Sequence, residues 1–256
     1  MVRRDDTMRT LIAATVLVVA FYRAPGSAED PCSFTIARLK YGGGGDWYNG
    51  PSSLFNLIKA VKKETQIPIC DSVAVVEIMD DDFFHYPFIY MTGHGNVHFS
   101  LKEKLRLRKF LIGGGFLFAN DDYGMDTSFR REMRSLFPEN PLVEIPAFHP
   151  IYSSVHKLPG LPKIHEHDGL PAQGFGIFFN NRLIVFYAFS SDIGDGMEDE
   201  DVYHDGEALH RLALNMGVNV VAWFFNPKEI ESRQKANNKR QNDSFSIAPF
   251  RGGAVY

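Results

Sequence analysis

Residues 88–122 read FIYMTGHGNVHFSLKEKLRLRKFLIGGGFLFANDD and give the clearest indication of the fold class. Two short apolar runs, Phe88 to Thr92 and Phe116 to Ala119, flank a segment in which apolar and charged side chains recur with a helical period. A capping box at Ser100 to Glu103 begins this helix, and Gly113 to Gly115 end it. A strand, a helix and a second strand in this order are typical of a parallel sheet covered by helices.

Strand and helix patterns alternate along the rest of the chain as well. Val218 to Phe225 alone could form a strand, but its apolar residues continue the helical period of the preceding segment across Gly217. We therefore predict an α/β fold with a doubly wound, mostly parallel sheet, a C-terminal β-hairpin and a long helix. The other expected elements are strands at Phe34 to Leu39 and Val73 to Ile78, helices capped by Ser52 or Ser53 and by Asp126, an extended segment at Leu142 to Ile145, a hairpin of Gly174 to Phe179 with Leu183 to Phe189, and a helix from Asp205 to Phe225.

The composition is that of an ordinary globular domain. Of the 256 residues, 45% are hydrophobic and 23% are charged. A disordered chain, a coiled-coil rod, a disulfide-dense miniprotein or a polytopic membrane protein would each have a very different composition. The net charge of -4 argues against nucleic-acid binding, because phosphates are bound by a basic face.

The N-terminus has the pattern of a secretory signal peptide. Arg3, Arg4 and Arg9 precede the apolar run Leu11 to Phe21, and small residues follow up to Ala28. The apolar run is too short to span about 30 Å of hydrocarbon as a helix. We therefore expect cleavage after Ala28 and export to the periplasm or the medium, with an uncleaved membrane anchor as the alternative.

Three segments follow from these patterns. Residues 1–28 form the signal peptide, and residues 29–227 form one α/β domain. Residues 228–256 are polar and have no sustained apolar period, so we expect a disordered tail.

Cys32 and Cys70 are the two cysteines of the chain. Each precedes a predicted strand, and neighbouring parallel strands would place both cysteines at the same edge of the sheet. An oxidising compartment then favours a disulfide between them. Two unpaired thiols are the alternative.

Polar residues of catalytic type follow five of the predicted extended segments. In open α/β sheets, ligands bind outside the carboxyl ends of the strands, so these residues are expected to meet at one edge. Taken singly, such residues also cap turns and helices. The candidates are Asp46, Trp47, Tyr48, His94, Asp121, Asp122, His149 and Asp192.

Five stretches carry a family resemblance through their order and spacing: YGGGGDWY at 41–48, YPFIYMTGHG at 86–95, GGFLFANDD at 114–122, His149-Pro150, and DIGDGME at 192–198. Together they resemble the family catalogued as domain of unknown function 4159. The resemblance covers residues 34 to 226 and implies a flavodoxin-like sheet related to the class I glutamine amidotransferases. It implies no established activity.

The chemistry of amidotransferases, serine hydrolases and nucleotide-binding proteins is not expected here. An amidotransferase needs a cysteine at a strand-to-helix elbow, whereas Cys70 lies ahead of a predicted strand. No G-x-S-x-G elbow exists. Residues 45–52 have the spacing of a phosphate loop, but Pro51 replaces the lysine and Asp46 would repel a phosphate.

The remaining carboxylates and imidazoles suit two kinds of chemistry. They could bind a divalent metal, or a carboxylate pair could act as acid and base on a sugar. The candidate catalytic centre is Asp121 or Asp122 together with His94. Adjacent aspartates in an extended segment point apart, so one of the two is expected to cap the next turn. The candidate ligand-binding residues are Asp46, Trp47, Tyr48, His149 and Asp192.

Two further clusters have metal-binding residue types in an unfavourable context. His165 to Asp168 lies in a predicted loop between prolines and is expected at the surface. The acidic run Asp192 to Asp201 lacks the spacing of a calcium loop. Charge runs of this kind are usually solvated.

Two functions are compatible with these patterns. The first is an exported ligand-binding or scaffolding module of the cell envelope, which recognises a glycan or a protein partner. The alternative is a carboxylate- or metal-dependent hydrolase that acts on a glycan or another envelope substrate. The absence of a recognised nucleophile favours the binding module, and if the protein is an enzyme, we expect a hydrolase.

Overall fold

The computed structural model describes residue 32, residues 34–226 and residue 228. The predicted signal peptide at 1–28 lies outside the described residues, as does the predicted tail at 228–256 apart from Lys228. No helix in the described part of the chain is long and apolar enough to span a membrane.

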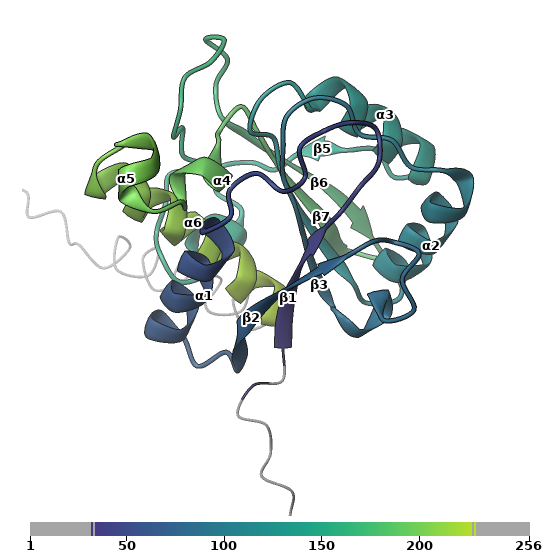
Figure 1. Cartoon of the computed structure of the whole chain (residues 1–256), viewed down its shortest axis with the longest axis horizontal. Helices are drawn as coiled ribbons and strands as arrows, with labels where there is room; N and C mark the ends of the chain where they lie inside the picture. The colour runs from purple at the N-terminus through teal and green to yellow at the C-terminus, as the bar shows by residue number, and fades with distance from the viewer. Residues whose placement is uncertain (1–31, 33, 227, 229–256) are drawn as a thin grey trace, which may run out of the picture. The chain divides into compact units, whose positions relative to one another are not determined.

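Seven strands form one sheet in the order β2-β1-β3-β4-β7-β6-β5. Strands β2, β1, β3, β4 and β7 are parallel, whereas β6 and β5 add to β7 in antiparallel fashion. The chain passes from β1 to β2 on one side and returns to β3 on the other, which confirms the predicted doubly wound fold (Figure 1). The strands are β1 (Phe34–Leu39), β2 (Ile69–Val76), β3 (Phe88–Met91), β4 (Phe116–Asn120), β5 (Val143–Glu144), β6 (Gln173–Phe179) and β7 (Arg182–Phe189).

Helices cover both faces of this sheet, α1 and α6 on one face and α2 and α3 on the other (Figure 1). The predicted long C-terminal helix is confirmed as α6, and its apolar period continues across Gly217. The helices are α1 (Ser53–Glu64), α2 (Leu101–Ile112), α3 (Asp126–Leu136), α4 (Ile193–Gly196), α5 (Glu200–Tyr203) and α6 (Glu207–Phe225), with short 3-10 turns η1 (Phe83–His85) and η2 (Pro150–Ser153).

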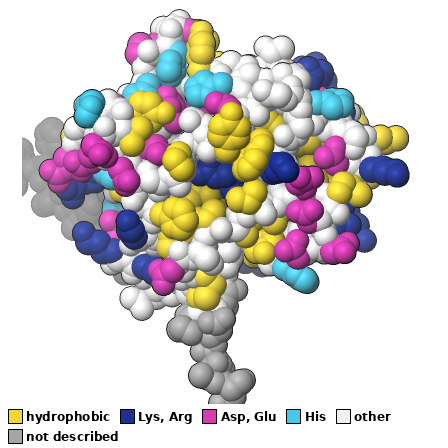
Figure 2. Space-filling model, in the orientation of Figure 1, with side chains coloured by type: hydrophobic (Ala, Val, Ile, Leu, Met, Phe, Trp, Pro, Cys, Tyr) yellow, Lys and Arg dark blue, Asp and Glu magenta, His cyan; other side chains and the backbone are white. Residues whose placement is uncertain are grey.

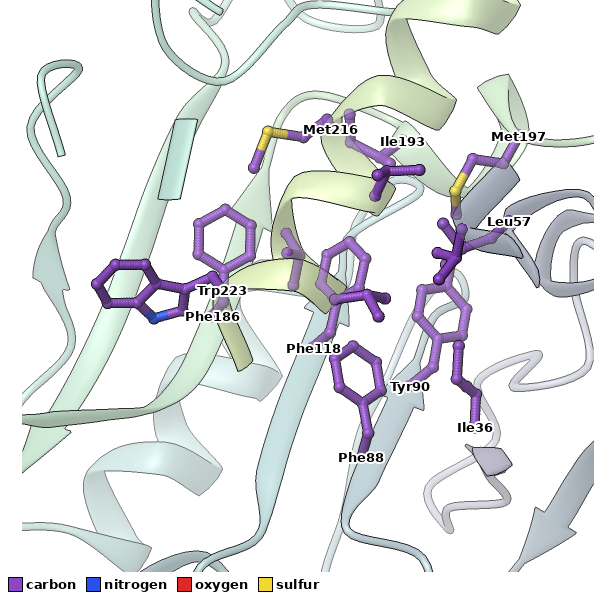
Figure 3. Close-up of a cluster of buried hydrophobic side chains, with 14 of the residues drawn as sticks. Ile36, Leu57, Phe88, Tyr90, Phe118, Phe186, Ile193, Met197, Met216 and Trp223 are labelled. Atoms are coloured by element: carbon purple, nitrogen blue, oxygen red, sulfur yellow. The ribbon is translucent and has the colours of Figure 1, made fainter. Parts of the chain in front are cut away.

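The central strands are apolar on both faces because both faces are covered. In β4, Phe116 and Phe118 belong to the core that faces α1 and α6, while Leu117 and Ala119 belong to the core that faces α2 and α3. Successive side chains of a strand point to opposite faces, which explains this division. The aromatic core under α6 also contains the β3, β7 and α6 side chains drawn in Figure 3.

Strand β2 differs from its predicted range. It begins at Ile69 and ends at Val76, whereas the sequence predicted Val73 to Ile78. An irregularity in the pairing with β1 lets the strand begin earlier, because Phe34 pairs with Ile69 while Ile36 pairs with Val73. Cys70 therefore lies inside the strand instead of before it.

The predicted disulfide and hairpin are both confirmed. Cys32 and Cys70 are bonded, with their Cα atoms 4.8 Å apart. Asn180 and Asn181 connect β6 to β7 with φ angles of 49° and 60°. Two consecutive left-handed residues are typical of the tight hairpin turn that matches the twist of the strands.

Candidate functional site

The carboxyl ends of β1, β3, β4 and β7 meet at one edge of the sheet, as the sequence predicted. An open depression of about 540 Å³ lies there, and its lining includes His94, His165, His167, Asp195 and Asp205. Figure 2 shows histidine and acidic side chains gathered in the region above α4 and α5. The site is thus rich in carboxylates and imidazoles.

Asp122 is buried at the inner end of this site. Its Oδ2 accepts a hydrogen bond of 2.9 Å from Asn49 Nδ2, and its Oδ1 accepts one of 2.9 Å from Thr92 Oγ1. Asn120 Nδ2 also donates to Oδ1. Burial raises the pKa of Asp122 well above its ordinary value, and the charges of Asp195 and Asp192 raise it further. Residues from the loop after β1, from the end of β3 and from the last position of β4 therefore hold one crowded carboxylate.

Asp195 approaches Asp122 from α4. Asn49 Nδ2 donates to Asp195 Oδ1 at 2.9 Å, so one amide group joins the two carboxylates. Burial, followed by the charge of Asp192, raises the pKa of Asp195 to about 6. The close approach needs Gly194, because a Cβ there would lie 2.9 Å from Asp122 Oδ1 and 2.7 Å from Asn120 Nδ2.

Asp121 takes the capping role that the sequence assigned to one of the two adjacent aspartates. Its Oδ1 accepts a hydrogen bond of 2.9 Å from the backbone N–H of Met125, the residue that precedes α3. Its Oδ2 accepts one of 3.0 Å from the Tyr187 hydroxyl. Asp121 therefore supports α3 and β7, and Asp122 is the member of the pair that reaches the site. The predicted cap, Asp126, is instead the first residue of α3.

Asp192 contacts two histidines of the site through one of its carboxylate oxygens. It follows β7 with a left-handed backbone (φ 66°), and it is 1% exposed. Its Oδ2 lies 2.6 Å from His165 Nδ1 and 3.0 Å from His167 Nε2. The opposite ring nitrogen of His165 lies 2.8 Å from both oxygens of Asp205. The hydrogen bond to Asp192 is the main reason why the pKa of His165 is raised to about 9.

His94 and Asp46 form a second histidine–carboxylate pair at the same edge. His94 Nδ1 lies 3.0 Å from Asp46 Oδ2, and the His94 backbone N–H donates to Asp46 Oδ1. Gly93 makes this approach possible, since a Cβ there would lie 2.9 Å from Asp46 Oδ1. The His94 side chain is 43% exposed and lines the depression. His94 is thus paired with Asp46, whereas the sequence had placed it in one centre with Asp121 or Asp122.

The other three candidates are placed differently. Trp47 packs edge to face against Tyr48, which is 65% exposed in the loop after β1. His149 lies apart from the depression: its ring packs 5.0 Å from that of Trp223 in α6, and its Nδ1 accepts a hydrogen bond from the Ile151 N–H. Burial lowers the pKa of His149 to about 4. His149 therefore has a packing and capping role.

The N-terminus of α1 is already occupied by a carboxylate of the chain itself. Glu198 Oε1 accepts hydrogen bonds from the backbone N–H groups of Ser52 and Ser53 at 3.0 and 2.7 Å. A helix N-terminus attracts anions, and here Glu198 fills that position. The N–H groups of Ser52 and Ser53 are therefore hydrogen-bonded within the domain.

Comparison with known families decides the relationship that the motifs indicated. Residues 35–225 match the family described as Domain of unknown function (DUF4159). The chain belongs to this family. No curated protein matches the sequence significantly.

Two expectations about the DUF4159 domain are wrong in part. The segment His165 to Asp168 was expected at the surface, but His165 points inward to Asp192, because the Ile164 N–H bonds to Ser191 O at 2.8 Å and folds the loop back. The run Asp192 to Asp201 was expected to be solvated, but Asp192, Asp195 and Glu198 are buried. They are buried because α4 packs over the ends of β3 and β4, which the charge of the run does not reveal.

Sequence reasoning on this DUF4159 domain also missed Asn49, Asp195 and Asp205 as site residues. A signal for Asp195 exists in the spacing of Asp192 and Asp195, since residues three apart lie on one side of a helical turn. Asn49 and Asp205 carry no such signal, because their role depends on contacts between distant segments.

Proposed function

We propose that this domain is a metal-dependent hydrolase whose cation is held by His165, His167 and Asp192. The observation that carries the proposal is the approach of two imidazole nitrogens, at 2.6 and 3.0 Å, to one oxygen of a buried carboxylate. One ligand atom from each residue lies within 4.8 Å of the others. Two imidazoles and a carboxylate suit zinc, manganese and related divalent metals.

Asp205 supports this assignment from outside the ligand set. A histidine that binds a metal through one ring nitrogen usually donates from the other to a carboxylate, which fixes its tautomer and orientation. His165 has this arrangement, with Nδ1 toward Asp192 and Nε2 at 2.8 Å from Asp205. Asp205 is therefore a positioning residue for His165.

The Asp46–His94 pair supports hydrolysis. Because His94 Nδ1 faces Asp46, Nε2 is the ring nitrogen that remains for a water or a substrate. A histidine oriented by a carboxylate is a common form of general base. None of the described residues that line the depression is serine, threonine or cysteine, so we assign the nucleophile to a water that the cation activates.

The proposed substrate is a glycan or another component of the cell envelope, met by the protein after export. The Cys32–Cys70 disulfide supports an oxidising compartment. The described lining contains acidic residues and neither lysine nor arginine, which disfavours an anionic substrate. The Tyr123 ring stacks 4.9 Å from that of His167 and offers an aromatic face of the kind on which sugars stack.

A ligand-binding module for a glycan or a protein partner is the second candidate. The exposed Tyr48, in the loop that also carries Asp46, favours it, since exposed aromatic side chains are common in binding surfaces. In this case the same edge would bind its ligand without turnover.

Metal analysis of the purified protein tests the proposed hydrolase. We expect stoichiometric zinc or manganese in the parent protein and its loss in His167→Ala, while His85→Ala, an exposed histidine of η1, keeps the metal. Release of reducing sugars or acyl groups from envelope polysaccharides should depend on the metal. Unchanged metal content in His167→Ala would contradict the proposal, and bound metal without any turnover would favour the binding module.

A further inference from the structure

Asp122, Asp192 and Asp195 form a cluster of three carboxylates beside the histidine pair. One oxygen from each lies within 4.8 Å of the others, and the three residues are 2%, 1% and 5% exposed. Within the described part of the chain, the ion pairs of Asp192 are with histidines, and neither Asp122 nor Asp195 is paired with lysine or arginine. Charges buried in this way are normally paired or bound to a metal.

The two oxygens of Asp192 have different surroundings. Oδ2 contacts both histidines, whereas Oδ1 is buried and has no hydrogen-bond partner among the described residues. A buried carboxylate oxygen without a donor is costly and needs an explanation. Asp192 belongs both to the group with His165 and His167 and to the group with Asp122 and Asp195.

The neighbours of Asp122 and Asp195 orient these carboxylates without neutralising them. Asn49 Nδ2 donates 2.9 Å hydrogen bonds to Asp122 Oδ2 and to Asp195 Oδ1, and Thr92 Oγ1 donates to Asp122 Oδ1. These donors are uncharged. The carboxylates are therefore held in fixed positions close to each other while their repulsion remains.

We propose that Asp122, Asp192 and Asp195 bind a second divalent cation, so that Asp192 bridges two metal ions, one on each of its oxygens. This inference rests on the proposed function, because it adds a second ion to the histidine site. The cation would take the position facing Asp192 Oδ1, the oxygen that lacks a protein partner. It would also relieve the repulsion among the three carboxylates.

The two positions should prefer different metals. The first offers two imidazole nitrogens and one carboxylate oxygen, a set that suits zinc. The second offers carboxylate oxygens alone, which suit hard cations such as magnesium, manganese or calcium. In enzymes with two metal ions about 3.5–4 Å apart, the ions together stabilise the attacking and leaving oxygens. The second ion therefore extends the proposed hydrolytic site.

Sequential metal titration tests the inference. The purified protein is stripped with a chelator and titrated calorimetrically with Zn²⁺ and then with Mn²⁺. We expect one equivalent of each per chain. Asp195→Asn should weaken Mn²⁺ binding by more than about tenfold and leave the Zn²⁺ equivalent in place. Asp201→Asn, which removes an exposed acid of α5, is the matched control and should leave both equivalents unchanged.

A second measurement uses the unmodified protein and so does not depend on how a variant folds. With Co²⁺ in the histidine site, Mn²⁺ bound next to Asp192 should show an electron paramagnetic resonance signal altered by spin coupling.

One equivalent of Zn²⁺ that is lost in His167→Ala, with no Mn²⁺ equivalent, would overturn the second site and leave the proposed function standing. Binding of neither metal would overturn both. A Mn²⁺ equivalent that persists in Asp195→Asn would place it elsewhere and overturn the bridged centre.

Discussion

Asp121 and Asp122 are neighbours in the chain, yet their side chains serve different parts of the molecule. Asp121 reaches the N-terminus of α3 and the Tyr187 hydroxyl, while Asp122 reaches Asn49 and Thr92. Burial raises the pKa of both carboxyls, so a shifted pKa does not separate the structural residue from the site residue. Their hydrogen-bond partners do.

Replacing Asp121 should therefore affect stability and leave metal binding intact. Asp121→Ala removes the acceptor for the Met125 N–H and for the Tyr187 hydroxyl. We expect a loss of about 1–2 kcal/mol in the free energy of unfolding. Urea denaturation measures this loss, and calorimetry with Zn²⁺ checks that the affinity is within about twofold of the parent. A large loss of affinity would place Asp121 in the site after all.

Asp195→Asn, unlike Asp121→Ala, should not lower stability when no metal is bound. It removes one of three carboxylate charges that lie within 4.8 Å of one another, and the remaining amide oxygen can still accept from Asn49. Residues kept for function often cost stability. In the presence of a chelator, we expect the variant to melt at the same temperature as the parent or a few degrees above it. Differential scanning calorimetry at pH 8 decides this, and a lower melting temperature would show that the charge of Asp195 is stabilising.

The lowered pKa of His149 should make the free energy of unfolding depend on pH. Burial lowers its pKa from 6.5 to about 4, so between these values the unfolded state takes up a proton that the folded state does not. Stability should therefore fall as the pH decreases from about 6.5 to 4. His149→Asn keeps a side-chain acceptor for the turn at η2, and the part of this slope due to residue 149 should disappear. Urea unfolding at pH 7 and pH 5 measures the difference, and equal slopes in parent and variant would contradict the assignment.

At the scale of elements, α4 determines the inner geometry of the site. It places Gly194 against Asn120, Tyr90 and Asp122, at distances that exclude a side chain. The same segment brings Glu198 to the N-terminus of α1. Helix α4 thus connects the end of β7 to both the site and the neighbouring helix.

Gly194→Ala should consequently disturb the site and lower stability. Its Cβ would lie within 2.9 Å of three buried polar atoms, so α4 has to shift. We expect a loss of about 1–3 kcal/mol in the free energy of unfolding and weaker metal binding. Gly42→Ala is a suitable control, because its Cβ would make only an ordinary contact at 3.4 Å. Equal stability of both variants would show that α4 adapts freely.

At the scale of the whole molecule, the two ends of the sheet have separate functions. The site lies at the carboxyl ends of the parallel strands, whereas Cys70 lies near the start of β2 and is bonded to Cys32. The bridge therefore anchors the beginning of the domain to the edge strand without reaching the site.

Removal of the disulfide should lower stability without changing metal affinity. The bonded cysteines are 38 residues apart in the sequence, and closing a loop of that length stabilises a protein by about 4 kcal/mol on the chain-entropy account. Cys32→Ser should lower the unfolding free energy by up to about this amount. Chemical denaturation with and without a reductant measures the effect, and a parent protein that is insensitive to reductant would contradict a stabilising bridge.

Local patterns in the sequence were sufficient for most of the fold. The capping box before α2, the apolar strands and the helical period across Gly217 are short-range features, and they agree with the fold as a whole. The approximate position of the site also follows from local information, because residues after parallel strands meet at one edge. Asp46, His94 and Asp122 were predicted in this way, as was His149, which packs against Trp223 apart from the depression.

Which of these side chains face one another depends on long-range packing. His165, Asp195 and Asp205 join Asp192 through the folding of a loop over β7 and the packing of α4, and Asn49 bridges carboxylates that are 73 and 146 residues away. Such contacts depend on how whole elements are placed relative to one another, so no periodic pattern in the sequence indicates them. Local sequence patterns thus account for the sheet and for the edge at which the candidate site lies, while the packing of loops and of α4 selects the residues that form it.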